Sequence, residues 1–216
     1  MDLLTFLDQN LSRTFFLLWE HVWLVALSLV IAMCIGVPLG VLITKKKELA
    51  QKVLGGANII MTVPSIALFG LMLPVLALVG HGLGKVPAVI ALVLYSLLPI
   101  IRNTYIAIKN VDPALVDAGK GMGMTKWQLL REVEIPLAVP VILAGLKTAA
   151  VMNIGIAAIA AYVGAGGLGV FIQQGIARSH EAMILTGALG VSLLAVFVDL
   201  GMSSLERLLT PKGLKI

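Results

Sequence analysis

Long apolar stretches separated by short polar segments dominate the pattern of this chain. A helix needs about 20 mostly apolar residues to cross the hydrocarbon core of a bilayer, which is about 30 Å thick. Stretches of that kind predict five membrane-spanning helices, which we number spans one to five, at residues 21–44, 55–79, 86–108, 136–163 and 182–209. The pattern therefore indicates an all-α membrane protein with one transmembrane domain, residues 21–209.

Composition excludes the alternative of a soluble domain. Hydrophobic residues make up 59% of the chain and charged residues 12%, and the mean hydropathy is +1.03. Because so few charged side chains cannot cover the surface of a soluble protein, apolar side chains must face lipid. The net charge of +5 comes without a basic stripe interleaved with aromatic residues, so no nucleic-acid partner is expected. Cys34 is the only cysteine, which excludes an internal disulfide and a thiolate metal cluster, and no metal site is expected.

Lysine and arginine are distributed unevenly between the two sides of the predicted spans. Eleven of them follow spans one, three and five, and three lie on the opposite side. The eleven are Lys45, Lys46, Lys47, Lys52, Lys109, Lys120, Lys126, Arg131, Arg207, Lys212 and Lys215, and the three are Arg13, Lys85 and Arg178. Because short cytoplasmic loops retain an excess of these residues, we expect the N-terminus outside and the C-terminus in the cytoplasm.

The two ends of the chain are expected to lie outside the spans. Residues 3–18 are apolar, but Asp8, Asn10 and Arg13 interrupt them, which favours an interfacial helix over a span. Residues 1–20 are therefore predicted to form an outer interfacial segment. No basic region precedes the first apolar run, so no cleavable signal peptide is expected. Residues 210–216 are predicted to form a cytoplasmic tail.

The longest polar stretch, residues 109–135 between spans three and four, predicts two short helices. Asp112 followed by Pro113 indicates the start of the first, and Gly119, Gly121 and Gly123 are expected to end it. Thr125 and Gln128 have the spacing of a capping box for the second. In that second helix, Trp127, Leu130 and Val133 are spaced to share one face, and Ile135 and Pro136 are expected to close it. Taken alone, this insertion fits a cytoplasmic docking knob and an ordinary membrane-surface hairpin equally well.

Seven positions of this insertion resemble the EAA loop of ABC-importer permeases, written E-A-A-x3-G-x9-I-x-L-P. The matching residues are Asp117, Ala118, Gly119, Gly123, Val133, Ile135 and Pro136. Four of them depart from the pattern, and Gly119 in place of alanine weakens the helix by about 1 kcal/mol. The resemblance implies a five-span permease of the type I ABC importer fold. It also implies that residues 109–135, with Trp127 among them, form the coupling element that docks in a cleft of the cytoplasmic ATPase subunit.

Further segments resemble the osmoprotectant branch of these permeases. They are residues 62–67, 98–105, 111–115 and 163–169. That branch carries glycine betaine, carnitine, choline and related quaternary amines, which the resemblance implies as substrates. The segment at 163–169 also occurs in methionine-type permeases. A permease for another small solute, such as methionine or another amino-acid derivative, is therefore the alternative.

The resemblance implies partners as well. The chain lacks the phosphate-binding pattern G-x4-G-K-[ST], so it cannot hydrolyse ATP alone. ATP and Mg are expected on cytoplasmic ATPase subunits, while this chain is expected to bind no cofactor and to be no enzyme. An extracytoplasmic solute-binding protein is implied too, and the implied location is the bacterial cell membrane. Five helices are few to surround a translocation path, so a second permease subunit, identical or homologous, is expected.

An intramembrane enzyme and a channel are the rivals from other classes. An enzyme would need a nucleophile and a base at one depth, but His21, His81 and His180 all fall at the outer edge. A channel would need a symmetric pore-lining filter, which five asymmetric spans do not suggest. An aromatic cage for a quaternary ammonium needs two or more rings, and all three tryptophans are placed near a surface. Substrate choice is therefore expected mainly in the binding protein.

Two charged residues are predicted inside spans, where charge is costly and marks a candidate functional site. Lys147 in span four and Asp199 in span five both lie about 15–17 Å from the inner ends of their helices, at about 1.5 Å per residue. Their equal depth makes them plausible partners. They can form a structural ion pair, line or gate the transport route, or fail to meet.

Three other residues are candidates for movement or coupling. Arg102, near the inner end of span three, can brace the insertion through an acidic residue or extend to the lipid headgroups. Pro64 and Ser65 predict a kink in the inner half of span two that moves in gating, although kinks also occur in static bundles.

A glycine-rich turn at the outer end of span four is the last candidate. Its glycines are Gly164, Gly166, Gly167 and Gly169, and a segment too short to span the membrane follows them. The turn is interpreted either as a flexible connector or as an outer gate or docking surface for a binding protein.

Overall fold

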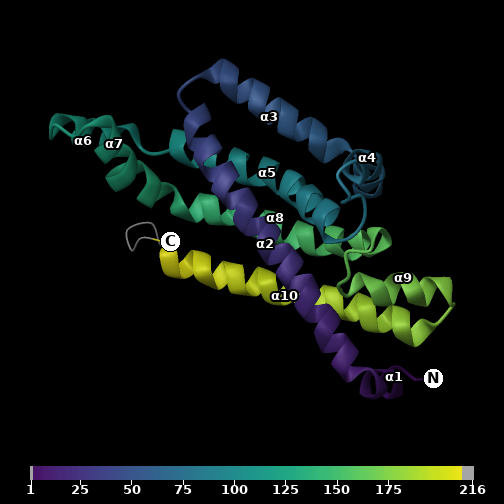
Figure 1. The fold of residues 1–216 in the computed structure, drawn as a ribbon. Helices are drawn as coiled ribbons and strands as arrows, with labels where there is room; N and C mark the ends of the chain where they lie inside the picture. The colour runs from purple at the N-terminus through teal and green to yellow at the C-terminus, as the bar shows by residue number, and fades with distance from the viewer. Residues whose placement is uncertain (1, 211–216) are drawn as a thin grey trace.

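A computed structural model describes residues 2–210 and consists, over that range, of helices without strands. Of four long helices, three run alongside one another and the first crosses them (Figure 1), and each is long and apolar enough to cross a membrane. They are α2 (Leu11–Ile43), α5 (Lys85–Lys109), α8 (Ile135–Ile159) and α10 (Glu181–Leu209). These helices match predicted spans one, three, four and five.

Small residues let three of these helices approach closely. Gly36 and Gly40 lie one turn apart on α2 and face α5, where a Cβ on Gly40 would stand 2.6 Å from Thr104 Cβ. On α8, a Cβ on Gly145 would stand 2.8 Å from the carbonyl oxygen of Pro99 in α5. In membranes, such glycine contacts allow the backbone packing that holds helices together. α5 is therefore the central helix, clamped between α2 and α8.

Predicted span two is a broken pair of helices instead of one kinked helix. α3 (Lys47–Thr62) starts eight residues earlier than predicted and meets α4 (Ser65–Ala77) at an angle of 99°. The break falls at Val63, which is extended because the following Pro64 disfavours the helical conformation. The Tyr95 hydroxyl of α5 donates a hydrogen bond to the Val63 carbonyl, which fixes the break. Pro64 and Ser65 thus lie at a corner between two helices.

The N-terminal segment also differs from the prediction. Only α1 (Leu3–Gln9) is separate, and α2 begins at Leu11, so much of the predicted interfacial segment belongs to the first long helix. Arg13, one of the residues that appeared to interrupt the apolar run, has partners from a distant part of the chain. Arg13 donates to Gln174 Oε1 at 2.8 Å and lies over the Phe171 ring, both on α9 (Gly169–Ala177).

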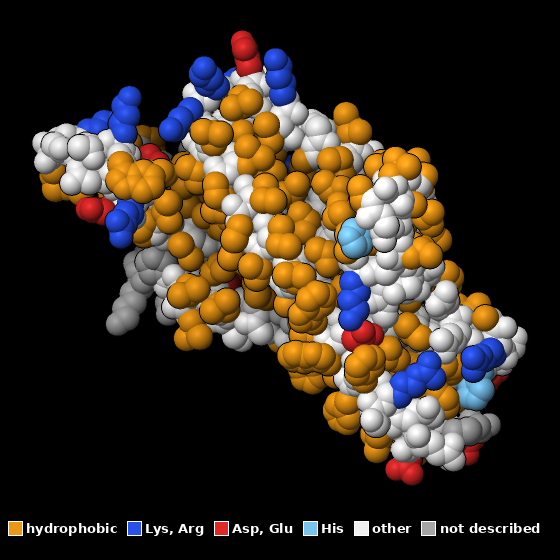
Figure 2. Space-filling view, viewed as in Figure 1, with side chains coloured by type: hydrophobic (Ala, Val, Ile, Leu, Met, Phe, Trp, Pro, Cys, Tyr) orange, Lys and Arg blue, Asp and Glu red, His pale blue; other side chains and the backbone are white. Residues whose placement is uncertain are grey.

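The outside of the bundle is largely apolar. Figure 2 shows hydrophobic side chains covering its middle, while many lysines and arginines gather toward the ends. Phe197 on α10 is 69% exposed, whereas Leu24, Leu92 and Ile154 in the core are at most 1% exposed. A surface of this kind suits a lipid environment or contact with other membrane helices. Of the predicted tail at residues 210–216, all but Thr210 lie outside the described residues.

Candidate functional site

The insertion between α5 and α8 begins with the helix that the sequence predicts. α6 (Pro113–Gly121) starts where the Asp112 side chain accepts a hydrogen bond from the Ala114 backbone N–H at 2.9 Å. It ends in a Schellman motif, in which the Met124 N–H bonds the Gly119 carbonyl and the Gly123 N–H bonds the Lys120 carbonyl. Gly123 has φ +79°, so it alone ends the helix. The prediction that Gly119 and Gly121 also stop the helix was wrong, because both lie within α6.

The second helix is not closed at Ile135 and Pro136, as predicted, but continues into span four. α7 (Lys126–Leu129) begins with the predicted capping box between Thr125 and Gln128. A π-helical turn, Leu130–Glu134, then joins it to α8, so that residues Lys126–Val163 form one helical run. Pro136 lacks an N–H and its ring crowds the preceding turn, and a wider π turn accommodates both effects.

Packing of the two helices depends on a residue that the sequence analysis missed. Leu129 is 7% exposed and covers Gly119, which is buried. Trp127, Leu130 and Val133 do not share one buried face, since Trp127 is 67% exposed and the other two are half-buried. The position of Leu129, an apolar residue four positions after the Thr125 cap, could have indicated that it packs against the first helix.

The α6–α7 hairpin lies at one end of the bundle (Figure 1) and exposes both apolar and charged side chains. Leu115, Met122 and Trp127 are 46%, 71% and 67% exposed. Asp117 pairs with Lys120 at 2.9 Å on the exposed side of α6, and Ala118 next to Asp117 is exposed as well. A cavity of about 910 Å³ separates the hairpin from the end of α2. This surface has the mixed character of a protein contact.

Gly119→Ala is expected to leave the hairpin intact. The new Cβ would stand 2.7 Å from Leu129 Cδ1 and 3.2 Å from Met124 Sδ, and both atoms end flexible side chains. A gain of about 1 kcal/mol in helix propensity offsets the small shift, so thermal stability and transport should stay close to wild type. Gly123→Ala is the matched variant and should lose about 1–2 kcal/mol, because an alanine is strained at φ +79°. Equal stability of the two variants in a thermal unfolding experiment would contradict this account.

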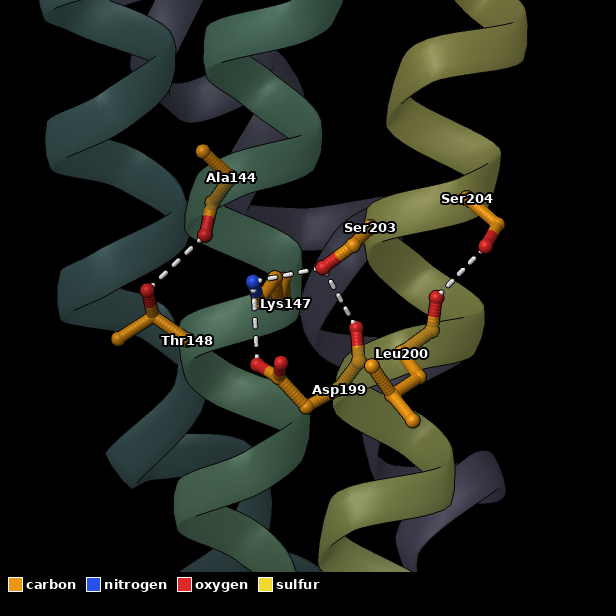
Figure 3. A network of polar contacts seen from close by, with 7 residues as sticks. All are labelled: Ala144, Lys147, Thr148, Asp199, Leu200, Ser203 and Ser204. Carbon is orange, nitrogen blue, oxygen red and sulfur yellow. Dashed lines mark hydrogen bonds and ion pairs between the residues drawn. The ribbon is translucent and has the colours of Figure 1, made fainter.

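The structure brings Lys147 and Asp199 together about halfway along α8. Lys147 Nζ lies 3.0 Å from Asp199 Oδ1 and donates to Ser203 Oγ at 2.8 Å (Figure 3). The Ser203 hydroxyl in turn donates to the Asp199 carbonyl. The two charged side chains are 29% and 43% exposed, so the pair lies at the edge of the bundle.

The glycine-rich turn lies at the opposite end from the hairpin and is held by charged residues. Gly164, Gly166 and Gly167 have positive φ, and the Gly167 N–H donates to Glu20 Oε2 at 3.3 Å. Glu20 also pairs with Lys85 at 2.8 Å. Gly169 starts α9, where a Cβ would collide with a backbone carbonyl of α8. In the sequence, Lys85 served only to predict which side of the membrane each loop occupies. A lysine on the side that has few of them could also have indicated an ion pair such as this one with Glu20.

Arg102 does not brace the insertion in this structure. Its side chain is exposed, and the described residues show no ion pair between it and Asp112, Asp117 or Glu134. Arg102 lies about two turns before the end of α5, and its long side chain can extend toward the headgroup region.

Comparison with known proteins gives consistent relatives. Residues 36–212 match the family described as binding-protein-dependent transport system inner membrane component. The osmoprotectant import permease protein OsmW of Salmonella typhimurium is 53% identical over 215 residues, covering 100% of both chains. The glycine betaine/carnitine/choline transport system permease protein OpuCB of Bacillus subtilis is 42% identical, covering 99% of this chain and 96% of its own.

Solved structures share the fold. A chain of the MetNI methionine ABC transporter, in an inward-facing conformation, superimposes with a TM-score of 0.83 at 25% identity. The match covers 95% of this chain and 98% of that one. A chain of an amino acid ABC transporter has a TM-score of 0.75 at 20% identity, with 96% and 97% of the chains covered.

Proposed function

The chain belongs to the family of binding-protein-dependent transport system inner membrane components, and from this we propose that it is the permease subunit of an ATP-driven importer for quaternary-amine osmoprotectants. The observation that carries the substrate class is the 53% identity with an osmoprotectant permease over the full length of both chains. Methionine is the weaker candidate, since the likeness to the methionine transporter is at 25% identity. Glycine betaine, carnitine and choline are therefore the proposed solutes.

The proposed orientation places the α6–α7 hairpin in the cytoplasm. Lys45, Lys46 and Lys47 follow α2, whose end borders the same cavity as the hairpin, and an excess of lysine is typical of cytoplasmic loops. The N-terminus and α9 then lie on the outer side. There, the glycine-rich turn, fixed by Glu20 and Lys85, offers a shaped surface for a solute-binding protein.

The proposed partner of the hairpin is a cytoplasmic ATPase subunit. Trp127 is exposed on a short helix whose other side is packed by Leu129, which is the arrangement of an anchor for a protein cleft. Because α7 runs through the π turn into α8 without a loop, movement of the hairpin passes directly to a membrane-spanning helix. Two ATPase subunits that close on ATP and Mg would draw two hairpins together and open the path outward.

A second permease subunit, identical or homologous, completes the proposed path. One chain leaves the Lys147–Asp199 pair partly exposed between two long apolar helices. Exposure of such charges to lipid is unfavourable, so another membrane helix or an aqueous cavity must adjoin this face.

Reconstituted transport tests the proposed function. We expect proteoliposomes containing this permease and its ATPase partner to take up labelled glycine betaine, carnitine or choline only with ATP on the hairpin side and the binding protein on the other. Methionine serves as the competing solute, and liposomes with the permease alone serve as the control. Uptake without ATP, or uptake of methionine in place of the amines, would refute the proposal.

A further inference from the structure

The Lys147–Asp199 pair lies at a depth where a lipid contact is very costly. Lys147 is at the midpoint of α8, about 18 Å from either end at about 1.5 Å per residue, and Asp199 is about 15 Å from the C-terminal end of α10. Intramembrane charges of this kind face the bundle interior or a water-filled cavity. Since the pair is only partly covered by its own chain, the rest of its cover must come from another membrane helix or from a water-filled cavity such as a transport path.

The pair lies beside an open pocket on the side of the bundle. A cavity of about 390 Å³ is lined by Lys147 and Asp199 together with Thr148, Val151 and Met152. Within the described residues, the Lys147 ammonium bonds only Asp199 and Ser203, although it carries three N–H donors. The site therefore offers a cation and an anion side by side, with donor capacity left for a ligand.

A purely structural role explains these features less well. Replacing a buried ion pair by apolar residues of similar volume is often neutral or stabilising, because the desolvation of two charges offsets their attraction. Stability alone gives little reason to keep two charges at this depth.

We infer that the Lys147–Asp199 pair binds zwitterionic solutes in transit, the solute carboxylate at Lys147 and its quaternary ammonium at Asp199. This inference rests on the proposed function. A zwitterion exchanges one ion pair for two and leaves no charge unpaired in the membrane. A simple cation such as choline satisfies Asp199 alone. The pair thus recognises betaine-type solutes by charge, without the aromatic rings that a cation–π site needs.

The first test compares a zwitterion with a cation in the reconstituted transporter. Lys147→Met should lower glycine betaine uptake at least about 10-fold more than choline uptake. The double variant Lys147→Met with Asp199→Leu leaves neither charge unpaired, so it should assemble with the ATPase at close to wild-type yield, yet lose at least about 10-fold in glycine betaine uptake. Equal effects on both solutes, wild-type uptake by the double variant, or failure of the double variant to assemble would each overturn the inference. Failure of the proposed function shows separately, as absence of amine uptake by the wild-type transporter.

The second test asks whether the site meets water. Val151→Cys places a thiol one turn from Lys147 in the cavity, in a chain whose Cys34 is replaced by alanine. A charged thiol reagent should label this variant in the assembled transporter, because only a hydrated thiol ionises, and glycine betaine should slow the labelling. Phe197→Cys is the control, since Phe197 lies two positions before Asp199 on the other side of α10 and is 69% exposed. Labelling of the Phe197→Cys variant with no labelling of the Val151→Cys variant would overturn the inference.

Discussion

Replacing Gly40 by valine is expected to force α2 away from α5 and to leave little folded transporter in the membrane. A Cβ at this position would stand 2.6 Å from Thr104 Cβ and 3.0 Å from the carbonyl oxygen of Ile101. Thr104 is fully buried and its hydroxyl is bonded to the Ile100 carbonyl, so it has no room to turn aside. Overpacking typically lowers the free energy of unfolding by about 1–3 kcal/mol. We expect a loss at the upper end of that range, because the backbone carbonyl of Ile101 cannot move aside as a side chain can.

The measurement is the amount of assembled transporter extracted from membranes, with its thermal midpoint. Gly55→Val is the matched control, because Gly55 is also within a helix and a Cβ there meets nothing within 4 Å. We expect the control to assemble at close to wild-type levels. Similar losses for the two variants would show that valine is disfavoured in these helices in general, and that the α2–α5 contact is not the reason.

Trp127→Ala is expected to weaken the attachment of the ATPase subunits and thereby to reduce transport. An exposed tryptophan that fills a partner's cleft typically contributes about 2 kcal/mol or more to binding, which corresponds to about a 30-fold weaker association. The permease should remain folded, because Trp127 is 67% exposed and Leu129 supplies the internal packing. We therefore expect normal amounts of the permease in membranes, weaker retention of the ATPase subunits and strongly reduced uptake.

Co-purification of the ATPase with each variant measures this effect directly. Leu208→Ala is the control, because Leu208 is 78% exposed near the C-terminal end of α10, outside the hairpin. Retention of the ATPase by the Trp127 variant at wild-type levels would remove Trp127 from the proposed contact. Loss of ATPase with the Leu208 variant would instead indicate a docking surface much wider than the hairpin.

Features that depend on neighbouring residues were predictable from the sequence. The cap at Asp112 and the capping box at Thr125 and Gln128 are local hydrogen-bond patterns, and both occur in the structure. Spans three and five were predicted to within one residue, because their long apolar runs end at charged or capping residues. Span four was recognised as a span, but its start was not, since the helix runs on from the hairpin.

Features that depend on distant contacts were not predictable in the same way. Pro64 indicated a disturbance, but the 99° angle is associated with a hydrogen bond from Tyr95, which lies on another helix. Arg13 looked like an interruption because its partners are on α9. In the hairpin, helical spacing predicted that Trp127 and Val133 share a face, but Val133 lies within the π turn, which shifts its register relative to Trp127.

Because α7 continues into α8, Lys147 and the second helix of the hairpin belong to one helical run, and a rotation at one end is transmitted to the other. A side-chain group about 6 Å from the axis of a helix moves by about 2 Å when the helix turns by about 20°. The contact between Lys147 and Asp199 is 3.0 Å long and joins this helical run to α10, a separate helix that is not continuous with the hairpin. A modest twist applied at the cytoplasmic end is therefore sufficient to open or close an ion pair in the middle of the membrane.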